Sequence, residues 1–230
     1  HGPSHIASLR SDERLTGAGY LDEHVGCMPP RSSVFERIER EEDVELTHRT
    51  AGALWMDDCV GTVVGRLREL ALEDNTILIS CTDHNCFDGK ATCYQGGVHI
   101  PFAMRWPGRI RAGYECDALI QHIDFVPTIL DACGVPVPGG MALDGKSVLP
   151  WLTGEKSDDR DRDDLYFEFG YTRAVATRKW KYIAFRYPAR LVDDMKSGRV
   201  DKAYDMVGRF GAELQIRRYP CYWDPDQLYD

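Results

Sequence analysis

An apolar run over residues 76–82 ends directly in an acid and an imidazole, Asp83 and His84. A run of this length, bounded by polar residues, predicts a buried β-strand. Open α/β sheets bind their ligands at the carboxyl ends of their strands. The run therefore predicts an α/β fold in which two side chains able to ligate a metal ion lie at one edge of a sheet.

The segment after this strand has the features of a site for an anion. Gly89-Lys90 brings a cation close to the same edge, and a turn containing Gly96 and Gly97 leads into a second apolar run over 102–106. The order along the chain is strand, metal pair, cation, glycine turn and strand. This order indicates an active site that acts on an anionic group.

The same block resembles the sulfatase family of the alkaline-phosphatase superfamily. The family pattern is a strand ending in Ser/Thr-Asp-Asn/His, then Gly-Lys-x-x-x-Tyr/Trp-Glu-Gly-Gly-x-Arg-x-Pro, then a strand ending in Trp-Pro-Gly. The chain has the corresponding residues at 82–84, 89–101 and 106–108, and further similar elements at 56–61, 122–130 and 144–147.

Two positions depart from the pattern, and a third has its less common residue. Gln95 stands where the pattern has an acid, and His99 stands where it has an Arg. His84 stands where many sulfatases have Asn, although some members have His.

The resemblance implies an α/β, alkaline-phosphatase-like sandwich with a central mixed or parallel sheet flanked by helices. It also implies a small C-terminal antiparallel-sheet subdomain. We expect 1–156 to be the second half of the catalytic domain and 157–230 to be an incomplete α+β subdomain. Because the chain starts at His1 and stops at Asp230, we expect a piece of a longer protein.

Local patterns predict the individual elements. Residues 1–45 are expected to be irregular, and 157–164 form a polar linker. Arg178-Lys179 predicts a hairpin between two strands. The expected helices cover 47–73 and 123–132, and the expected strands cover 76–82, 102–106, 165–169, 174–177 and 180–185.

The resemblance also assigns site residues. Asp83 and His84 would ligate a metal ion, and Lys90 would offset charge on a sulfate oxygen or on the departing oxygen. Lys90 is therefore both a catalytic and a substrate-binding candidate. His99 would orient the loop or contact substrate. His1, in a His-x-Pro element, would donate a proton to the leaving group as general acid.

One divalent metal ion is the expected cofactor. Calcium is the usual ion of the family, but a nitrogen ligand such as His84 is unusual for calcium. Magnesium, manganese and zinc therefore stay open.

Cys27 lies in a Cys-x-Pro-x-Arg match, the signature whose cysteine becomes formylglycine in sulfatases. Here the match follows His1, and residues 32–37 do not continue the pattern. We therefore expect the nucleophile, a formylglycine, upstream of this chain. Three other cysteines, Cys59, Cys81 and Cys133, are expected to be small buried apolar groups.

Net charge and hydropathy reduce the classes of partner expected for this chain. The net charge of −9 and pI near 5.3 argue against a nucleic-acid or membrane-surface binder. No stretch approaches the roughly 20 apolar residues of a membrane span. We expect a sulfated small molecule or glycan as substrate, and leave the oligomeric state open.

The predicted activity is hydrolysis of sulfate esters by a metal-assisted formylglycine mechanism. Two alternatives remain at this stage. One is a phosphodiesterase or phosphonate monoester hydrolase of the same superfamily, and the other is a non-catalytic relative that binds sulfated ligands.

Overall fold

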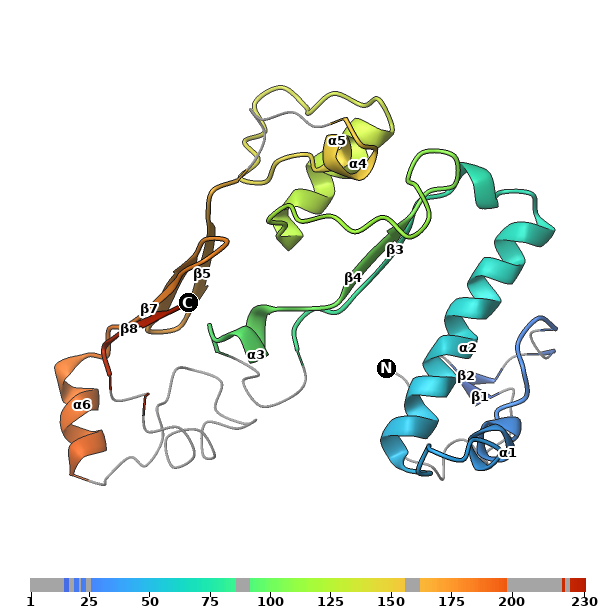
Figure 1. Cartoon of the computed structure of the whole chain (residues 1–230), viewed down its shortest axis with the longest axis horizontal. Helices are drawn as coiled ribbons and strands as arrows, with labels where there is room; N and C mark the ends of the chain where they lie inside the picture. The colour runs from blue at the N-terminus through green and yellow to red at the C-terminus, as the bar shows by residue number, and fades with distance from the viewer. Residues whose placement is uncertain are drawn as a thin grey trace. The chain divides into compact units, whose positions relative to one another are not determined.

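The computed structural model of the chain divides into two compact units, His1–Thr76 and Ile77–Asp230 (Figure 1). The predicted domain boundary at 156/157 falls outside the described residues and stays a prediction. The structure describes residues 15–16, 19–20, 22–23, 26–85, 92–155, 162–197, 221 and 224–230.

The first unit is built on two helices, α1 (Ser33–Glu39) and α2 (His48–Glu69). A short pair of strands precedes them and a 3₁₀ turn follows, namely β1 (Leu15–Thr16), β2 (Gly19–Tyr20) and η2 (Glu73–Asn75). Thr47 caps α2, because its hydroxyl accepts a hydrogen bond from the Thr50 N–H at 3.1 Å. The predicted helix over 47–73 is thus confirmed with a shorter C-terminal end.

The core of this unit lies where α1 meets the first turns of α2. Val34, Phe35 and Ile38 of α1 pack with Ala51 of α2. Residues 1–45 were expected to be irregular, and α1 corrects that prediction. The apolar positions Val34, Phe35 and Ile38 have helical spacing but are interrupted by charged residues, which hid the helix.

A largely buried ion pair joins the same two helices. The carboxylate of Asp58 on α2 accepts hydrogen bonds from both terminal nitrogens of Arg37 on α1. Asp58 therefore has a structural role as the ion-pair partner that joins α1 to α2.

The second unit begins with the predicted strand and its neighbour. β3 (Leu78–Cys81) pairs antiparallel with β4 (Phe102–Arg105), so that Leu78 lies opposite Arg105 and Cys81 opposite Phe102. Cys81 is exposed, as is Cys133, which corrects the expectation that both are buried. Within the described residues, no third strand joins this pair.

Two short helical segments follow β4. η3 (His122–Asp124) runs directly into α4 (Phe125–Ala132), and α5 (Leu149–Leu152) lies beyond the loop that follows α4. The predicted helix over 123–132 is confirmed, with a 3₁₀ first turn.

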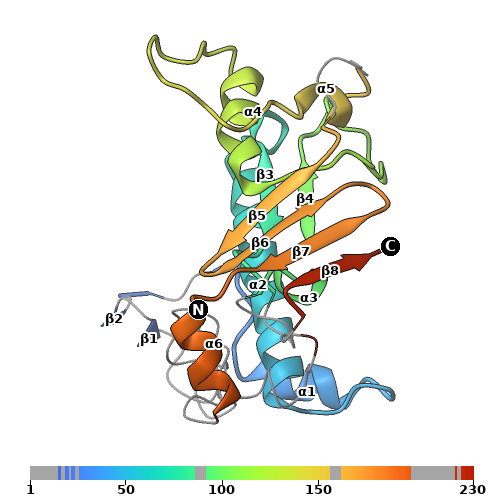
Figure 2. The ribbon, with the colours of Figure 1, turned by 90° about the vertical axis from the view of Figure 1, so that its left-hand side faces the viewer.

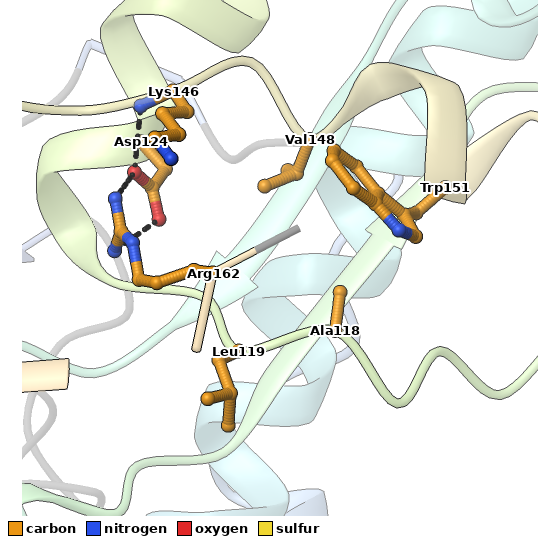
Figure 3. A pocket seen from close by; sticks show the side chains of 7 residues that line it. All are labelled: Ala118, Leu119, Asp124, Lys146, Val148, Trp151 and Arg162. Atoms are coloured by element: carbon orange, nitrogen blue, oxygen red, sulfur yellow. Dashed lines mark hydrogen bonds and ion pairs between the residues drawn. The ribbon is translucent and has the colours of Figure 1, made fainter. Parts of the chain in front are cut away.

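Asp124 is the buried centre of this region (Figure 3). Its Oδ1 accepts the N–H of Lys146 at 2.9 Å and the Arg162 guanidinium at 2.7 Å. Its Oδ2 accepts the N–H of Gln121 at 2.7 Å. A Cβ at position 145 would lie 1.9 Å from the Ile123 carbonyl oxygen, so the close approach requires Gly145.

The C-terminal part forms a four-stranded antiparallel sheet in the order β5-β6-β7-β8 (Figure 2). Its core contains Ala174, Ile183 and Phe185, together with Cys93 from the segment before α3. The predicted antiparallel C-terminal sheet is therefore present. The bounds are β5 (Leu165–Phe169), β6 (Thr172–Ala176), β7 (Lys181–Phe185) and β8 (Asp226–Tyr229), with α3 (Gln95–Val98) before β4 and α6 (Ala189–Lys196) after β7.

The predicted hairpin at Arg178-Lys179 is also present. Thr177 donates its N–H to the carbonyl of Trp180 at 2.7 Å, and the Thr177 hydroxyl accepts the Trp180 N–H at 2.9 Å. These bonds close the turn between β6 and β7.

Lys181, the first residue of β7, is a buried cation that is 7% exposed. Its ammonium donates to the amide oxygen of Gln95 at 2.9 Å and lies 4.8 Å from the centre of the Phe167 ring. Burial lowers the pKa of Lys181 to about 8, while the nearby Cys93 acts in the opposite direction.

We predict that Arg162→Ala lowers the free energy of unfolding by about 3 kcal/mol, because it leaves the Asp124 carboxylate buried without its charge partner. Urea denaturation of the full-length protein measures this loss. Arg173→Ala, which removes a half-exposed ion pair with Glu168, should cost about 1 kcal/mol or less. Equal losses in the two variants would contradict the role given to Arg162.

We predict that Lys181→Met makes the free energy of unfolding vary less with pH in the alkaline range. Between the folded pKa of about 8 and the ordinary value of 10.5, the unfolded state binds more protons at Lys181, so raising the pH through that window stabilises the fold. The wild type should therefore gain stability from pH 8 to pH 10 relative to Lys181→Met in urea titrations. A constant difference between the two proteins would contradict the buried-cation assignment.

Candidate metal and anion site

The residues after β3 are tied to α3. Asn85 donates its N–H to the Gly97 carbonyl at 3.3 Å, and its side-chain amide donates to the His99 carbonyl at 3.4 Å. These bonds hold the strand end that carries Asp83 and His84 against the glycine turn. The sequence predicted the order of strand, Asp-His pair and glycine turn, and the structure has the short helix α3 in place of the turn.

Asp83 and His84 turn their donor atoms toward each other. Asp83 Oδ1 accepts the backbone N–H of His84 at 2.9 Å, and Asp83 Oδ2 lies 3.3 Å from His84 Nε2. Two ligands about 2.2 Å from one ion and about 90° apart are about 3.1 Å from each other. The separation of the two atoms therefore fits two ligands of one ion.

The other nitrogen of His84 fixes the tautomer. His84 Nδ1 lies 3.0 Å from the carbonyl oxygen of Asn85, which only accepts, so Nδ1 carries the proton. The other ring nitrogen, Nε2, then faces the Asp83 carboxylate, and either a proton or a metal ion between the two atoms would join them. A backbone carbonyl on the second nitrogen is typical of metal-bound histidine.

The pair can supply two ligands. Over the described residues, no group of three His, Cys, Asp or Glu side chains has the proximity of a metal cluster. Divalent ions such as calcium take six to eight ligands and magnesium about six. A complete coordination sphere would therefore need ligands beyond Asp83 and His84.

His122 supports the same strand end, and the sequence gave it no role. His122 Nε2 donates to the carbonyl of Thr82 at 3.0 Å. The ring packs edge-on against Phe125 at 5.3 Å, and Phe125 packs on Phe102 of β4 at 5.4 Å. η3 thus positions the residue that immediately precedes Asp83.

Of the three remaining predicted site residues, the structure describes one. His1 and Lys90 lie outside the described residues, so their roles stay predictions. His99 is exposed and ends α3, with its N–H donated to the Gln95 carbonyl at 2.9 Å. The structure therefore brings Asp83, His84 and the His99 backbone together through Asn85.

The Cys27 segment belongs to the first unit. The Cys27 thiol lies 3.8 Å from the Thr62 carbonyl of α2, and the guanidinium of Arg31 lies 5.7 Å from the centre of the Trp55 ring. Both residues thus contact α2. That the nucleophile lies upstream of this chain stays a prediction.

Solved structures define the class of fold. A structure from Bacteroides thetaiotaomicron, concerned with metabolism of multiple glycosaminoglycans, is 26% identical with a TM-score of 0.56, covering 73% of this chain and 38% of that chain. BT4656 in complex with its substrate D-glucosamine-2-N,6-O-disulfate is 26% identical with a TM-score of 0.53, covering 67% and 37%. The α/β fold of the alkaline-phosphatase type is therefore confirmed.

Family profiles give the more particular assignment. The sulfatase profile matches residues 24–135. The profile of N-sulphoglucosamine sulphohydrolase, C-terminal, matches residues 82–196, which is half of the chain. The chain belongs to the sulfatase family.

Curated relatives support the same family assignment. The endo-4-O-sulfatase of Bacteroides thetaiotaomicron is 27% identical over 226 residues, covering 88% of this chain and 42% of that protein. Human steryl-sulfatase is 29% identical over 200 residues, covering 76% of this chain and 33% of that protein. The uncharacterized sulfatase YdeN of Escherichia coli is 34% identical over 116 residues, covering 45% of this chain and 20% of that protein. The chain spans between a fifth and about two fifths of the length of these relatives.

Within the described ranges, no helix combines the length and the apolar character needed to cross a membrane.

We predict that Asp83→Ala and His84→Ala each weaken the binding of Mn²⁺ or Ca²⁺ at least about tenfold, because each would remove one proposed ligand. Isothermal titration calorimetry of the full-length protein measures the affinity. Asp117→Ala, at an exposed acid away from the pair, is the matched control and should bind as the wild type does. Unchanged affinity in both ligand variants would contradict the assignment.

Proposed function

We propose that the protein carrying this chain hydrolyses sulfate esters with the help of a metal ion held in part by Asp83 and His84. The observation that supports this most is the facing pair of donor atoms, 3.3 Å apart, at a strand end in a chain of the sulfatase family. Calcium is the proposed ion. Because a nitrogen ligand such as His84 is unusual for calcium, magnesium, manganese and zinc are the alternatives, and of these zinc suits an imidazole nitrogen best.

Asp83 and His84 would hold the ion so that its charge faces the sulfate. When bound, the ion would supply positive charge to the sulfate oxygens and orient the sulfur for attack. A formylglycine upstream of this chain would supply the nucleophilic oxygen. The residues that hold the strand end, Asn85 and His122, would keep the two ligands in place.

Lys90 and His1 would act on the side of the alcohol. As the S–O bond breaks, negative charge grows on the oxygen that leaves, and the Lys90 ammonium would offset it. His1 would give that oxygen a proton, so that a neutral alcohol departs. His99 would contact the substrate or orient the loop between Lys90 and α3.

A sulfated glycan or a sulfated small molecule is the proposed substrate. Support comes from BT4656, whose substrate is D-glucosamine-2-N,6-O-disulfate, and from the endo-4-O-sulfatase. Because steryl-sulfatase is 29% identical, the proposed substrates also include sulfate esters of small molecules that are not glycans.

We predict that Lys90→Ala lowers kcat for a small aryl sulfate at least about a hundredfold, because stabilisation of the leaving oxygen is lost in the transition state. The free energy of unfolding should change by less than about 0.5 kcal/mol. Initial rates and urea denaturation of the full-length protein measure the two quantities. Lys196→Ala, at an exposed lysine of α6, is the control for removal of a charge.

Two results would contradict this role for Lys90. One is a parallel loss of folding and of activity, which would make the lysine structural. The other is full activity without it.

A further inference from the structure

A pocket of about 620 Å³ lies in the second unit, lined by α3, by the β6–β7 hairpin and by the end of β8. In Figures 1 and 2, α3 lies beside the β7–β8 side of the sheet. Pockets for small ligands usually measure about 300–1,000 Å³, so a sugar residue fits this one. Asp83, His84 and His99 are not among its lining residues.

A buried cation lies in the wall of the pocket. The ammonium of Lys181 donates to the uncharged amide of Gln95, and no carboxylate of the described residues forms an ion pair with it. A buried charge is costly unless it is paired with an opposite charge. Lys181 is therefore suited to an anionic partner that enters the pocket.

Gln95 is one of the positions at which this chain departs from the sulfatase pattern, which has an acid there. A carboxylate there would lie where the Gln95 oxygen now stands, 2.9 Å from the ammonium, and would neutralise Lys181 internally. The amide instead holds the Lys181 side chain in place, and over the residues that the structure describes no carboxylate compensates the Lys181 charge.

The charge of the lining as a whole favours an anion. Arg178, Lys179 and Lys181 are its cations, and Asp230 is its acid. Arg178 is held by a hydrogen bond to the Asp117 carbonyl. The cations therefore outnumber the acid and lie on one hairpin.

Aromatic side chains give the pocket the character of a sugar site. Trp180 is 45% exposed, and the Lys179 ammonium lies 4.9 Å from the centre of its ring, which leaves the rest of the ring open for stacking. The hydroxyls of Tyr94 and Tyr229 both donate to the Gln227 side-chain oxygen, at 2.7 and 2.6 Å. Gln227 is buried, so the two tyrosines are fixed in advance of binding.

We propose that this pocket binds an anionic sugar residue, with the sulfate or carboxylate on Lys181 and the ring against Trp180. The proposal extends the proposed function by giving a glycan a second point of attachment. It does not depend on turnover, because binding is measured without the metal ion.

Calorimetry of the full-length protein in excess chelator tests the proposal. The probes are glucosamine-2-N,6-O-disulfate, glucuronic acid and uncharged N-acetylglucosamine. The wild type should bind at least one anionic sugar about tenfold or more tightly than the neutral one. The sugar that binds identifies the anionic group as sulfate or carboxylate.

Two variants test whether binding depends on the charge of Lys181 and not only on correct folding. Lys181→Met removes the ammonium and keeps the length of the side chain, and Gln95→Glu supplies an internal counter-charge. Each should weaken binding of the anionic sugar about tenfold or more, while Lys196→Met should bind as the wild type does. Urea denaturation checks that each variant is folded.

The proposal is overturned if the anionic and neutral sugars bind equally, if neither anionic sugar binds, or if folded Lys181→Met and Gln95→Glu both keep wild-type affinity. Lys181-dependent binding by a protein that hydrolyses no sulfate ester would support this site while contradicting the proposed function.

Discussion

The buried ion pair between Asp124 and Arg162 organises the part of the second unit on which the candidate site depends. Asp124 is fully buried and also accepts the backbone N–H groups of Gln121 and Lys146. These bonds fix η3, and η3 carries His122, whose imidazole donates to the Thr82 carbonyl. The position of the strand end therefore rests on a charge pair that involves neither of the proposed ligands.

Elements with strong local patterns were predictable. The apolar runs at 76–82 and 102–106 contain the two strands of an antiparallel pair, and the predicted strand 165–169 matches β5 residue for residue. Helix α2 was predicted from its periodicity, yet three of its apolar residues, Met56, Val60 and Val63, are exposed. The contacts of α2 with α1 instead involve Ala51 and Asp58.

The long-range contacts could not be predicted. Arg162 lies in a stretch that reads as a polar linker, but its guanidinium reaches a carboxylate 38 residues earlier. Lys181 meets Gln95 across 86 residues, and no local pattern indicates that a lysine at a strand start is buried. Pairing across such separations depends on tertiary packing, which periodicity does not encode. The acid–imidazole pair was predictable because its two residues are adjacent.

The proposed chemistry depends on a cation between Asp83 and His84, and one comparison tests it most directly. Initial rates of the full-length protein would be measured on an aryl sulfate and on an aryl phosphate diester, before and after treatment with a chelator. The account predicts that sulfate release dominates and is lost on chelation, then restored by a divalent ion. Dominant cleavage of the phosphate diester, or sulfate release that the chelator leaves unchanged, would contradict it.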